Sequence, residues 1–197
     1  MTDRRTARRE RRTRETDIEL ELDLDGSGEC QVQTGVGFFD HMLTAMTRHG
    51  LLDLRLRCQG DLDVDPHHTV EDVGICLGQA VDQALGDKAG LVRFGHSYVA
   101  MDEALARVVV DLSGRPCLHL EAEFRQERVG DFPAALVREF FRAVADNGRM
   151  TLHVDLLRGV DAHHGIEAVF KAFGRALEQA SRRNERVRGI PSTKGTL

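Results

Sequence analysis

The chain is an imperfect tandem repeat, and this property constrains its fold more than any other. One constant offset pairs residues of the first half with identical residues of the second, and an offset two residues shorter pairs a further set. Repeated units that cannot bury their apolar faces alone have to pack against each other, so we expect one body. The first offset aligns Ala45 with Ala143, Gly50 with Gly148 and Leu54 with Leu152; the second aligns His67, His68, Glu71, Gly78, Ala80, Gln83 and Ala84 with His163, His164, Glu167, Gly174, Ala176, Gln179 and Ala180.

Both halves carry the same order of strand and helix patterns. Alternating apolar and polar residues predict strands, and apolar residues spaced three and four apart predict helices. We therefore predict an α+β fold of duplicated ββαβα half-units, with a sheet layer and helices packed on one side. The expected elements are strands at 17–24, 30–34 and 52–56 with helices at 38–50 and 70–85, then strands at 108–112, 118–124 and 152–156 with helices at 136–144 and 166–180.

Charge is distributed unevenly along the chain. Residues 1–14 hold seven arginines, yet the whole chain has 27 Lys+Arg against 32 Asp+Glu and a net charge of −5. The remaining body is acidic, which argues against nucleic-acid binding through its surface field. We interpret residues 1–11 as a basic mobile arm; the alternative is an arm that contacts nucleic acid or a partner.

The remaining composition favours a cytoplasmic protein. The apolar runs are too short to span a membrane, and the N-terminus lacks the apolar segment of a secretory signal. The four cysteines are far apart and form no CxxC motif, so a disulfide framework or thiolate metal site is not expected. They are Cys30, Cys58, Cys76 and Cys117.

A His-His-x-x-Glu motif begins the long helix of each half, at residues 67–71 and again at 163–167. Spacings of three and four place the glutamate on one helical face with the histidines, whereas adjacent histidines diverge by roughly 100° and can serve two ions. A single copy could be structural, but two equivalent copies predict a pseudo-symmetric metal site. Imidazole and carboxylate ligands without thiolate suit Mn, Fe, Co, Ni or Zn.

The repeat also aligns His41 with Glu139, each on the short helix of its half. Both side chains can bind a metal ion, so we predict them as further ligands. The alternative is that His41 caps or packs its helix and that Glu139 is solvated. Near the C-terminus, Ser192 and Lys194 lie in a flexible segment whose donors could wrap an anion. Without an anion, this segment would be a frayed terminus.

Six motifs, in order, resemble those of the imidazoleglycerol-phosphate dehydratases, enzymes of histidine biosynthesis. The resemblance covers nearly the whole chain from about residue 12, and it is to the single-function form without a phosphatase domain. It implies a duplicated half-unit related to the second domain of ribosomal protein S5. The motifs are FFDHM (38–42), DPHHTVEDVGICLG (65–78), MDEALA (101–106), DLSGRP (111–116), AHHGIEAVFKAFGRAL (162–177) and IPSTKG (190–195).

The resemblance also implies the assembly and the site. Family members form a 24-subunit homo-oligomer through trimers, with two Mn²⁺ per active site at subunit interfaces. Many relatives have His where this chain has Glu139, and several have Gln where it has Ala45. The implied metal ligands are His41, His67, His68, Glu71, Glu139, His163, His164 and Glu167; the catalytic residues are Glu15, Glu167 and Asp102; the phosphate-binding residues are Arg93, Arg115, Lys171, Ser192 and Lys194.

The implied reaction is dehydration of D-erythro-imidazole glycerol phosphate to imidazole acetol phosphate. The C–H bond to be broken has no adjacent carbonyl, so the imidazole ring has to accept the electrons. The resemblance implies a metal-bound imidazolate that loses hydroxide to give a diazafulvene-like intermediate. Glu15 resembles a family glutamate that reaches the active site of another subunit.

Three alternatives remain at this point: another dinuclear metalloenzyme such as a hydrolase, a nucleic-acid or assembly protein, and a metal-storage shell. We expect a lyase acting on a small phosphorylated imidazole, without nucleic acid or membrane. The expected organisation is a basic mobile arm at 1–11, a first half at 12–90, a second half at 91–186 and a substrate-binding tail at 187–197, the halves packing as one catalytic body.

Overall fold

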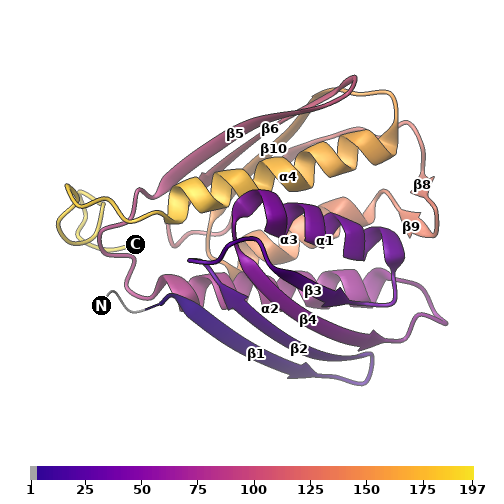
Figure 1. The fold of residues 1–197 in the computed structure, drawn as a ribbon, viewed down its shortest axis with the longest axis horizontal. Coiled ribbons are helices and arrows are strands. Elements are labelled where there is room, and N and C mark those ends of the chain that lie inside the picture. The colour runs from indigo at the N-terminus through magenta and orange to yellow at the C-terminus, as the bar shows by residue number, and fades with distance from the viewer. Residues whose placement is uncertain (1–3) are drawn as a thin grey trace.

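The computed structural model describes residues 4–197 as two outer sheets with four helices between them (Figure 1). The first half contains β1 (Thr6–Arg12), β2 (Thr16–Asp23), β3 (Cys30–Gln33), α1 (Gly37–Gly50), β4 (Asp53–Gly60) and α2 (His67–Leu85). The second contains β5 (Phe94–Met101), β6 (Ala104–Asp111), β7 (Cys117–Glu121), β8 (Arg128–Val129), β9 (Phe132–Pro133), α3 (Leu136–Asn147), β10 (Thr151–Arg158) and α4 (Ala162–Ser181).

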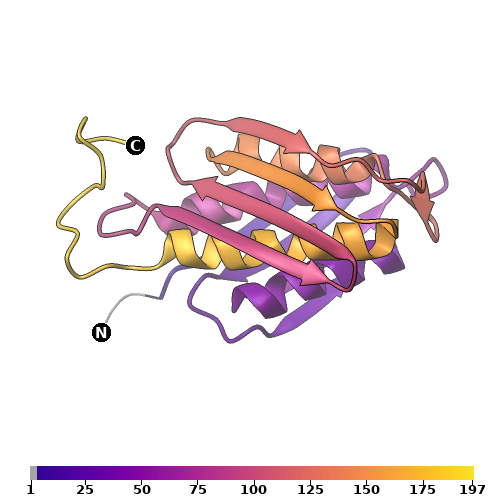
Figure 2. The same ribbon diagram turned by 90° about the horizontal axis from the view of Figure 1, so that it is seen from above.

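The two sheets have the same topology. Their strand orders are β1-β2-β4-β3 and β5-β6-β10-β7. In each, the third strand of the half pairs in parallel with the strand that follows the first helix, and the other pairings are antiparallel. The predicted α+β class with two equivalent halves is confirmed. Each half keeps a sheet of its own, with its helices on one face (Figure 2).

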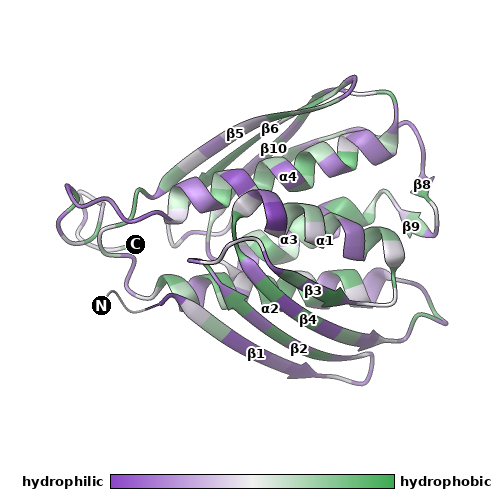
Figure 3. Ribbon diagram, in the orientation of Figure 1, coloured by the Kyte–Doolittle hydropathy of each residue, from purple (hydrophilic) through white to green (hydrophobic). Residues whose placement is uncertain are grey.

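The core lies between the sheets and in the helical layer. Along β2, Ile18, Leu20 and Leu22 are buried while the intervening acidic residues are exposed, as expected for a strand with one wet face. Figure 3 shows this alternation along the outer strands. Helix α1 packs on α4, and α2 packs on α3. Stacked and edge-on phenylalanines fill the centre, namely Phe39, Phe132, Phe140, Phe141, Phe170 and Phe173.

The prediction of a mobile arm is wrong for residues 6–11, because they belong to β1. This strand pairs with β2 along its whole length, from Thr6 opposite Asp23 to Arg12 opposite Asp17. Arg9 and Arg11 are half-buried on its inner side, where their long apolar stems can cover α2. Because arginines occupy both faces of β1, its sequence lacks the apolar and polar alternation from which a strand is predicted. Residues 1–3 lie outside the described part of the chain.

The first half thus has one strand more than predicted, β1, and the second has three more, β5 and the short pair β8 and β9. The first half begins at β1 rather than at residue 12. The tail at 187–197 folds back on the body: the Gly90 N–H donates to the Gly189 carbonyl at 2.9 Å, and Arg93 donates to the Pro191 carbonyl at 2.8 Å. None of the helices within residues 4–197 is long and apolar enough to cross a membrane.

Candidate metal centres and active site

Two helices from different halves build the first candidate metal centre, here the first cluster. His41 comes from α1, and His163 and Glu167 come from α4. The Nε2 atoms of His163 and His41 lie 3.2 and 3.4 Å from the same carboxylate oxygen, Glu167 Oε2. Ligands bound at about 2.1 Å from one ion lie roughly 3 Å apart, so this donor set is of the right kind and size for a divalent cation.

The second cluster has the same plan with the halves exchanged. Glu139 comes from α3, and His67 and Glu71 come from α2. In each cluster the donor atoms all lie within 4.8 Å of one another, and His67 Nε2 is 3.9 Å from Glu71 Oε2. The cross-half pairing follows from the packing of α1 on α4 and of α2 on α3. Six of the eight predicted ligands are thus brought together, Glu139 among them.

His68 does not join either cluster within its own chain. Its Nδ1 lies 3.0 Å from Asp61, and its Nε2 lies 3.7 Å from Glu15 in the β1–β2 turn. The hydrogen bond with Asp61 raises the pKa of His68 above its usual value. The ring is therefore oriented through Nδ1, and its Nε2 faces a predicted catalytic carboxylate.

His164 repeats this arrangement in the second half. Its Nδ1 lies 2.8 Å from Glu103, which raises its pKa, and its Nε2 lies 3.9 Å from Asp102 in the β5–β6 turn. The backbone N–H of Asp161, the His164 ring and the N–H of Val160 lower the pKa of Glu103 to about 2. Glu15 and Asp102 occupy equivalent turns, each beside the second histidine of a motif. Asp61 and Glu103 were not predicted as partners of these histidines, because no rule of sequence spacing relates a turn residue to a helix.

The two clusters differ in their electrostatics. Burial of Glu167 opposes its ionisation, but the Lys171 ammonium, 2.6 Å away, and His41 outweigh burial and keep its pKa below the usual value. Glu71 in the second cluster is more exposed, and its neighbour Glu139 lies 3.4 Å from Arg142. Glu167 is therefore ionised near neutral pH and can hold a cation or accept a proton.

Four of the five predicted phosphate-binding residues line one surface hollow of about 440 Å³. Arg93 is held there by Asp111 at 2.7 and 3.1 Å. Lys171 does not share the hollow, because it is paired with Glu167 in the first cluster. A larger hollow of about 530 Å³ lies over the outer face of the first sheet and contains no predicted site residue. The residues of the smaller hollow are Arg93, Arg115, Pro191, Ser192, Thr193 and Lys194.

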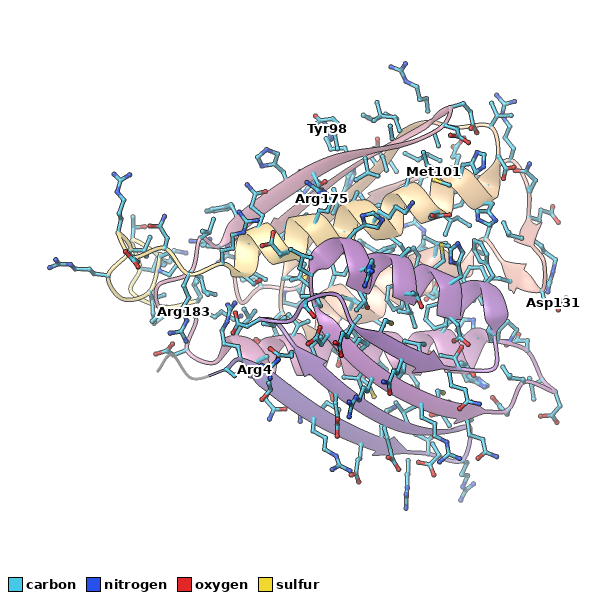
Figure 4. The ribbon with its side chains drawn as sticks, in the orientation of Figure 1. Arg4, Tyr98, Met101, Asp131, Arg175 and Arg183 are labelled. Carbon is cyan, nitrogen blue, oxygen red and sulfur yellow. The ribbon has the colours of Figure 1, made fainter. Side chains whose placement is uncertain are left out.

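The first cluster and the hollow lie at opposite ends of α4. The helix begins near His163, and its Ala180 carbonyl accepts a hydrogen bond from the Arg93 N–H at 2.8 Å. From Glu167 to Ala180 the helix covers about 20 Å at a rise of 1.5 Å per residue. In Figure 4, Arg183 marks the hollow's end of the molecule, and Met101, whose sulfur is 3.5 Å from Lys171 Nζ, lies toward the clusters.

Comparison with known proteins gives one consistent family. A profile described as imidazoleglycerol-phosphate dehydratase matches residues 34–177. Proteins of that name from Salinibacter ruber and Methylobacillus flagellatus are 58% and 54% identical, covering 98% and 100% of this chain and 96% and 100% of their own lengths. The crystal structure of the Staphylococcus aureus protein of the same name is 45% identical, with a TM-score of 0.83 over 91% of this chain and 99% of that one.

Proposed function

The chain belongs to the imidazoleglycerol-phosphate dehydratase family and is a hydro-lyase of histidine biosynthesis, and from this premise we propose that it works with two Mn²⁺ ions per active site. The observation that carries the proposal is the pair of clusters built from exchanged halves. Their imidazole and carboxylate donors suit Mn²⁺ and exclude a thiolate-type zinc site. The substrate ring likewise offers two nitrogens, so two equivalent ions match it.

Bound ions would draw electron density from the substrate ring and so make it the electron sink that this dehydration requires. The residues of the chain supply the proton transfers. We assign these transfers to Glu15 and Glu167, one at the leaving hydroxyl oxygen and one at the carbon that becomes the ketone precursor. Asp102 is a further polar group at the equivalent turn. Protonation of the leaving hydroxyl releases water and leaves a diazafulvene-like intermediate. Removal of a proton from the adjacent carbon then gives the enol, which ketonises to imidazole acetol phosphate.

The substrate phosphate binds in the hollow next to the tail. The guanidinium groups of Arg93 and Arg115, the Lys194 ammonium and the Ser192 hydroxyl can all donate hydrogen bonds to phosphate oxygens. Asp111 holds Arg93 in position through two hydrogen bonds. Lys171 instead serves the reacting end of the substrate, because it lies beside Glu167.

One chain does not make a complete site. From Glu167 of the first cluster to Ala180 beside the hollow, α4 spans about 20 Å, which exceeds the reach of an imidazole ring joined to a three-carbon phosphate. His68 with Glu15, and His164 with Asp102, lie outside the clusters of their own chain. We propose that a neighbouring copy supplies the missing groups, as in a 24-subunit cytoplasmic homo-oligomer built from trimers.

The metal content of cluster variants tests this proposal. Glu139→Gln and His41→Ala each remove one ligand from a different cluster. After dialysis against a trace concentration of Mn²⁺, we expect two Mn²⁺ per chain in the unaltered protein and about one per chain in each variant. Mass spectrometry of the bound metal measures this content. Arg138→Gln, next to Glu139 but bonded to the Leu120 carbonyl, is the control and keeps two. Full occupancy in both cluster variants would contradict the proposal.

A further inference from the structure

A buried carboxylate beside the second cluster belongs neither to the clusters nor to the hollow. Asp72 follows Glu71 on α2 and is 5% exposed. Its Oδ2 accepts a hydrogen bond from the Thr16 hydroxyl at 2.5 Å, and its Oδ1 lies 2.9 Å from an Arg11 nitrogen. Thr16 and Arg11 come from the two strands that flank the β1–β2 turn. Asp72 therefore ties both arms of this hairpin to α2.

The same hairpin presents Glu15. The Thr13 hydroxyl accepts the backbone N–H of Glu15 at 3.0 Å and that of Thr16 at 2.9 Å, and the Glu15 carbonyl accepts from the Asp61 N–H at 3.0 Å. The Glu15 backbone is thus fixed, while its half-exposed side chain faces His68 Nε2. Asp72 binds both strands of the hairpin, Thr16 of β2 and Arg11 of β1, and so helps to set the distance of the turn from α2.

The fold itself does not demand an acid at this position. The offset that aligns the two His-His-x-x-Glu motifs places Ala168 opposite Asp72, and Ala168 is fully buried in α4. Burying a carboxylate costs free energy that an alanine avoids, so the acid has a local purpose. The second half fixes its equivalent turn differently, through Glu103, which accepts from the Val160 and Asp161 N–H groups at 3.1 and 2.9 Å.

We propose that Asp72 is a positioning residue for catalysis: through Thr16 and Arg11 it fixes the β1–β2 turn so that Glu15 meets the reacting atoms. This inference rests on the proposed proton-transfer role of Glu15. It also gives residues 6–12 a function, since β1 supplies Arg11, which together with Thr16 binds Asp72. A displacement of about 1 Å in a catalytic group can cost on the order of 100-fold in rate, so the hydrogen bonds that fix this turn contribute to catalysis.

The test compares Thr16→Val, which removes the hydroxyl at constant volume, with Thr16→Ser, which keeps it. We expect Thr16→Val and Asp72→Asn to lower kcat about tenfold or more, with KM and Mn²⁺ content within about twofold of the unaltered enzyme, and Thr16→Ser to stay near normal. Thr47→Val is the matched control, because Thr47 is a buried threonine of α1 whose hydroxyl has no partner among the described residues.

A second comparison uses Glu15→Gln as the background. A residue that acts through Glu15 should cause no further loss of kcat once Glu15 is disabled, so the two effects should not add. Independent, multiplying effects, or a kcat of Thr16→Val equal to that of Thr47→Val, would overturn the inference. A loss of Mn²⁺ in step with activity would also overturn it, since Asp72 would then act on Glu71. If Glu15→Gln alone retains normal kcat, the proposed function of Glu15 fails instead.

Discussion

At the scale of single residues, Asp53 shows how one carboxylate holds a turn of the first half. It accepts the backbone N–H groups of Ser27, Gly28 and Glu29 at 2.8, 3.1 and 3.0 Å. Burial opposes its ionisation, but these three donors prevail and keep its pKa below the usual 3.8. Its contribution to stability is therefore present above pH 3.8 and is lost as the pH falls through the folded-state pKa.

We predict that Asp53→Ala lowers the free energy of unfolding by about 1–2 kcal/mol at neutral pH, because three donors lose their acceptor. The difference from the unaltered protein should shrink as the pH falls below 3.8. Denaturant unfolding of both proteins at several pH values measures it. A difference that stays constant down to the lowest pH would show that the charge of Asp53 has no part in holding the turn.

Helical spacing within the two His-His-x-x-Glu motifs predicted four of the six residues that form the clusters. His67, Glu71, His163 and Glu167 form helical i and i+4 pairs, and the pairs lie together as predicted. Lys171 and Glu167 also have i and i+4 spacing on α4, but the sequence analysis did not use this pair. The partners of the second histidines depend instead on turns and on register between elements. No periodicity within one segment contains that information.

At the scale of elements, two glycine pairs let the helices of the two halves approach closely. Gly50 at the end of α1 lies against Gly174 of α4, and Gly78 of α2 lies against Gly148 after α3. The repeat aligns Gly50 with Gly148 and Gly78 with Gly174, so one contact occurs twice. A Cβ on Gly174 would lie 2.2 Å from the Met46 carbonyl oxygen, where only backbone could move.

We predict that Gly174→Ala separates α1 from α4 and costs about 3 kcal/mol or more of stability, since the overlap requires a backbone shift. The first cluster bridges these two helices, so its Mn²⁺ affinity should fall with stability. Gly37→Ala is the control, because a Cβ there meets nothing within 4 Å. Thermal unfolding and metal titration measure both effects. Equal stability of the two variants would contradict the close crossing.

Sequence patterns predicted the strands that alternate cleanly and missed two long strands that do not, besides the short strands β8 and β9. Strand β1 carries arginines on both faces, and β5 exposes Phe94 and Tyr98 on its outer face while Gly95 and Ser97 face inward. Gly95 is required there because a Cβ would lie 1.9 Å from the Ala176 carbonyl oxygen. In both strands the apolar and polar positions are not those that a half-buried strand usually shows.

At the scale of the whole molecule, duplication explains the site better than either half does. The repeat predicted two equivalent halves in one body, but not that the helices would meet in the centre with a sheet on each outer side. This arrangement places a short helix of one half against the long helix of the other, and each cluster is shared between halves. It also places the clusters and the tail at opposite ends (Figure 1).

Co-expression of two inactive variants tests the division of the site between copies. Glu167→Gln disables the first cluster, and the double variant Arg115→Ala with Lys194→Ala disables the hollow. We predict that mixed oligomers regain up to about a quarter of normal kcat/KM, because some sites combine an intact cluster with an intact hollow from another chain. Oligomers of each variant alone are the controls. Activity equal to the average of those controls would place the complete site within one chain.

The central claim is that this hydro-lyase needs divalent cations at its two clusters. The most direct measurement is turnover of imidazole glycerol phosphate by protein stripped with EDTA, before and after addition of Mn²⁺. The account predicts negligible turnover without metal and formation of imidazole acetol phosphate once Mn²⁺ is restored. Undiminished turnover by protein shown to be metal-free would contradict the account, and so would no turnover by assembled protein carrying two Mn²⁺ per chain.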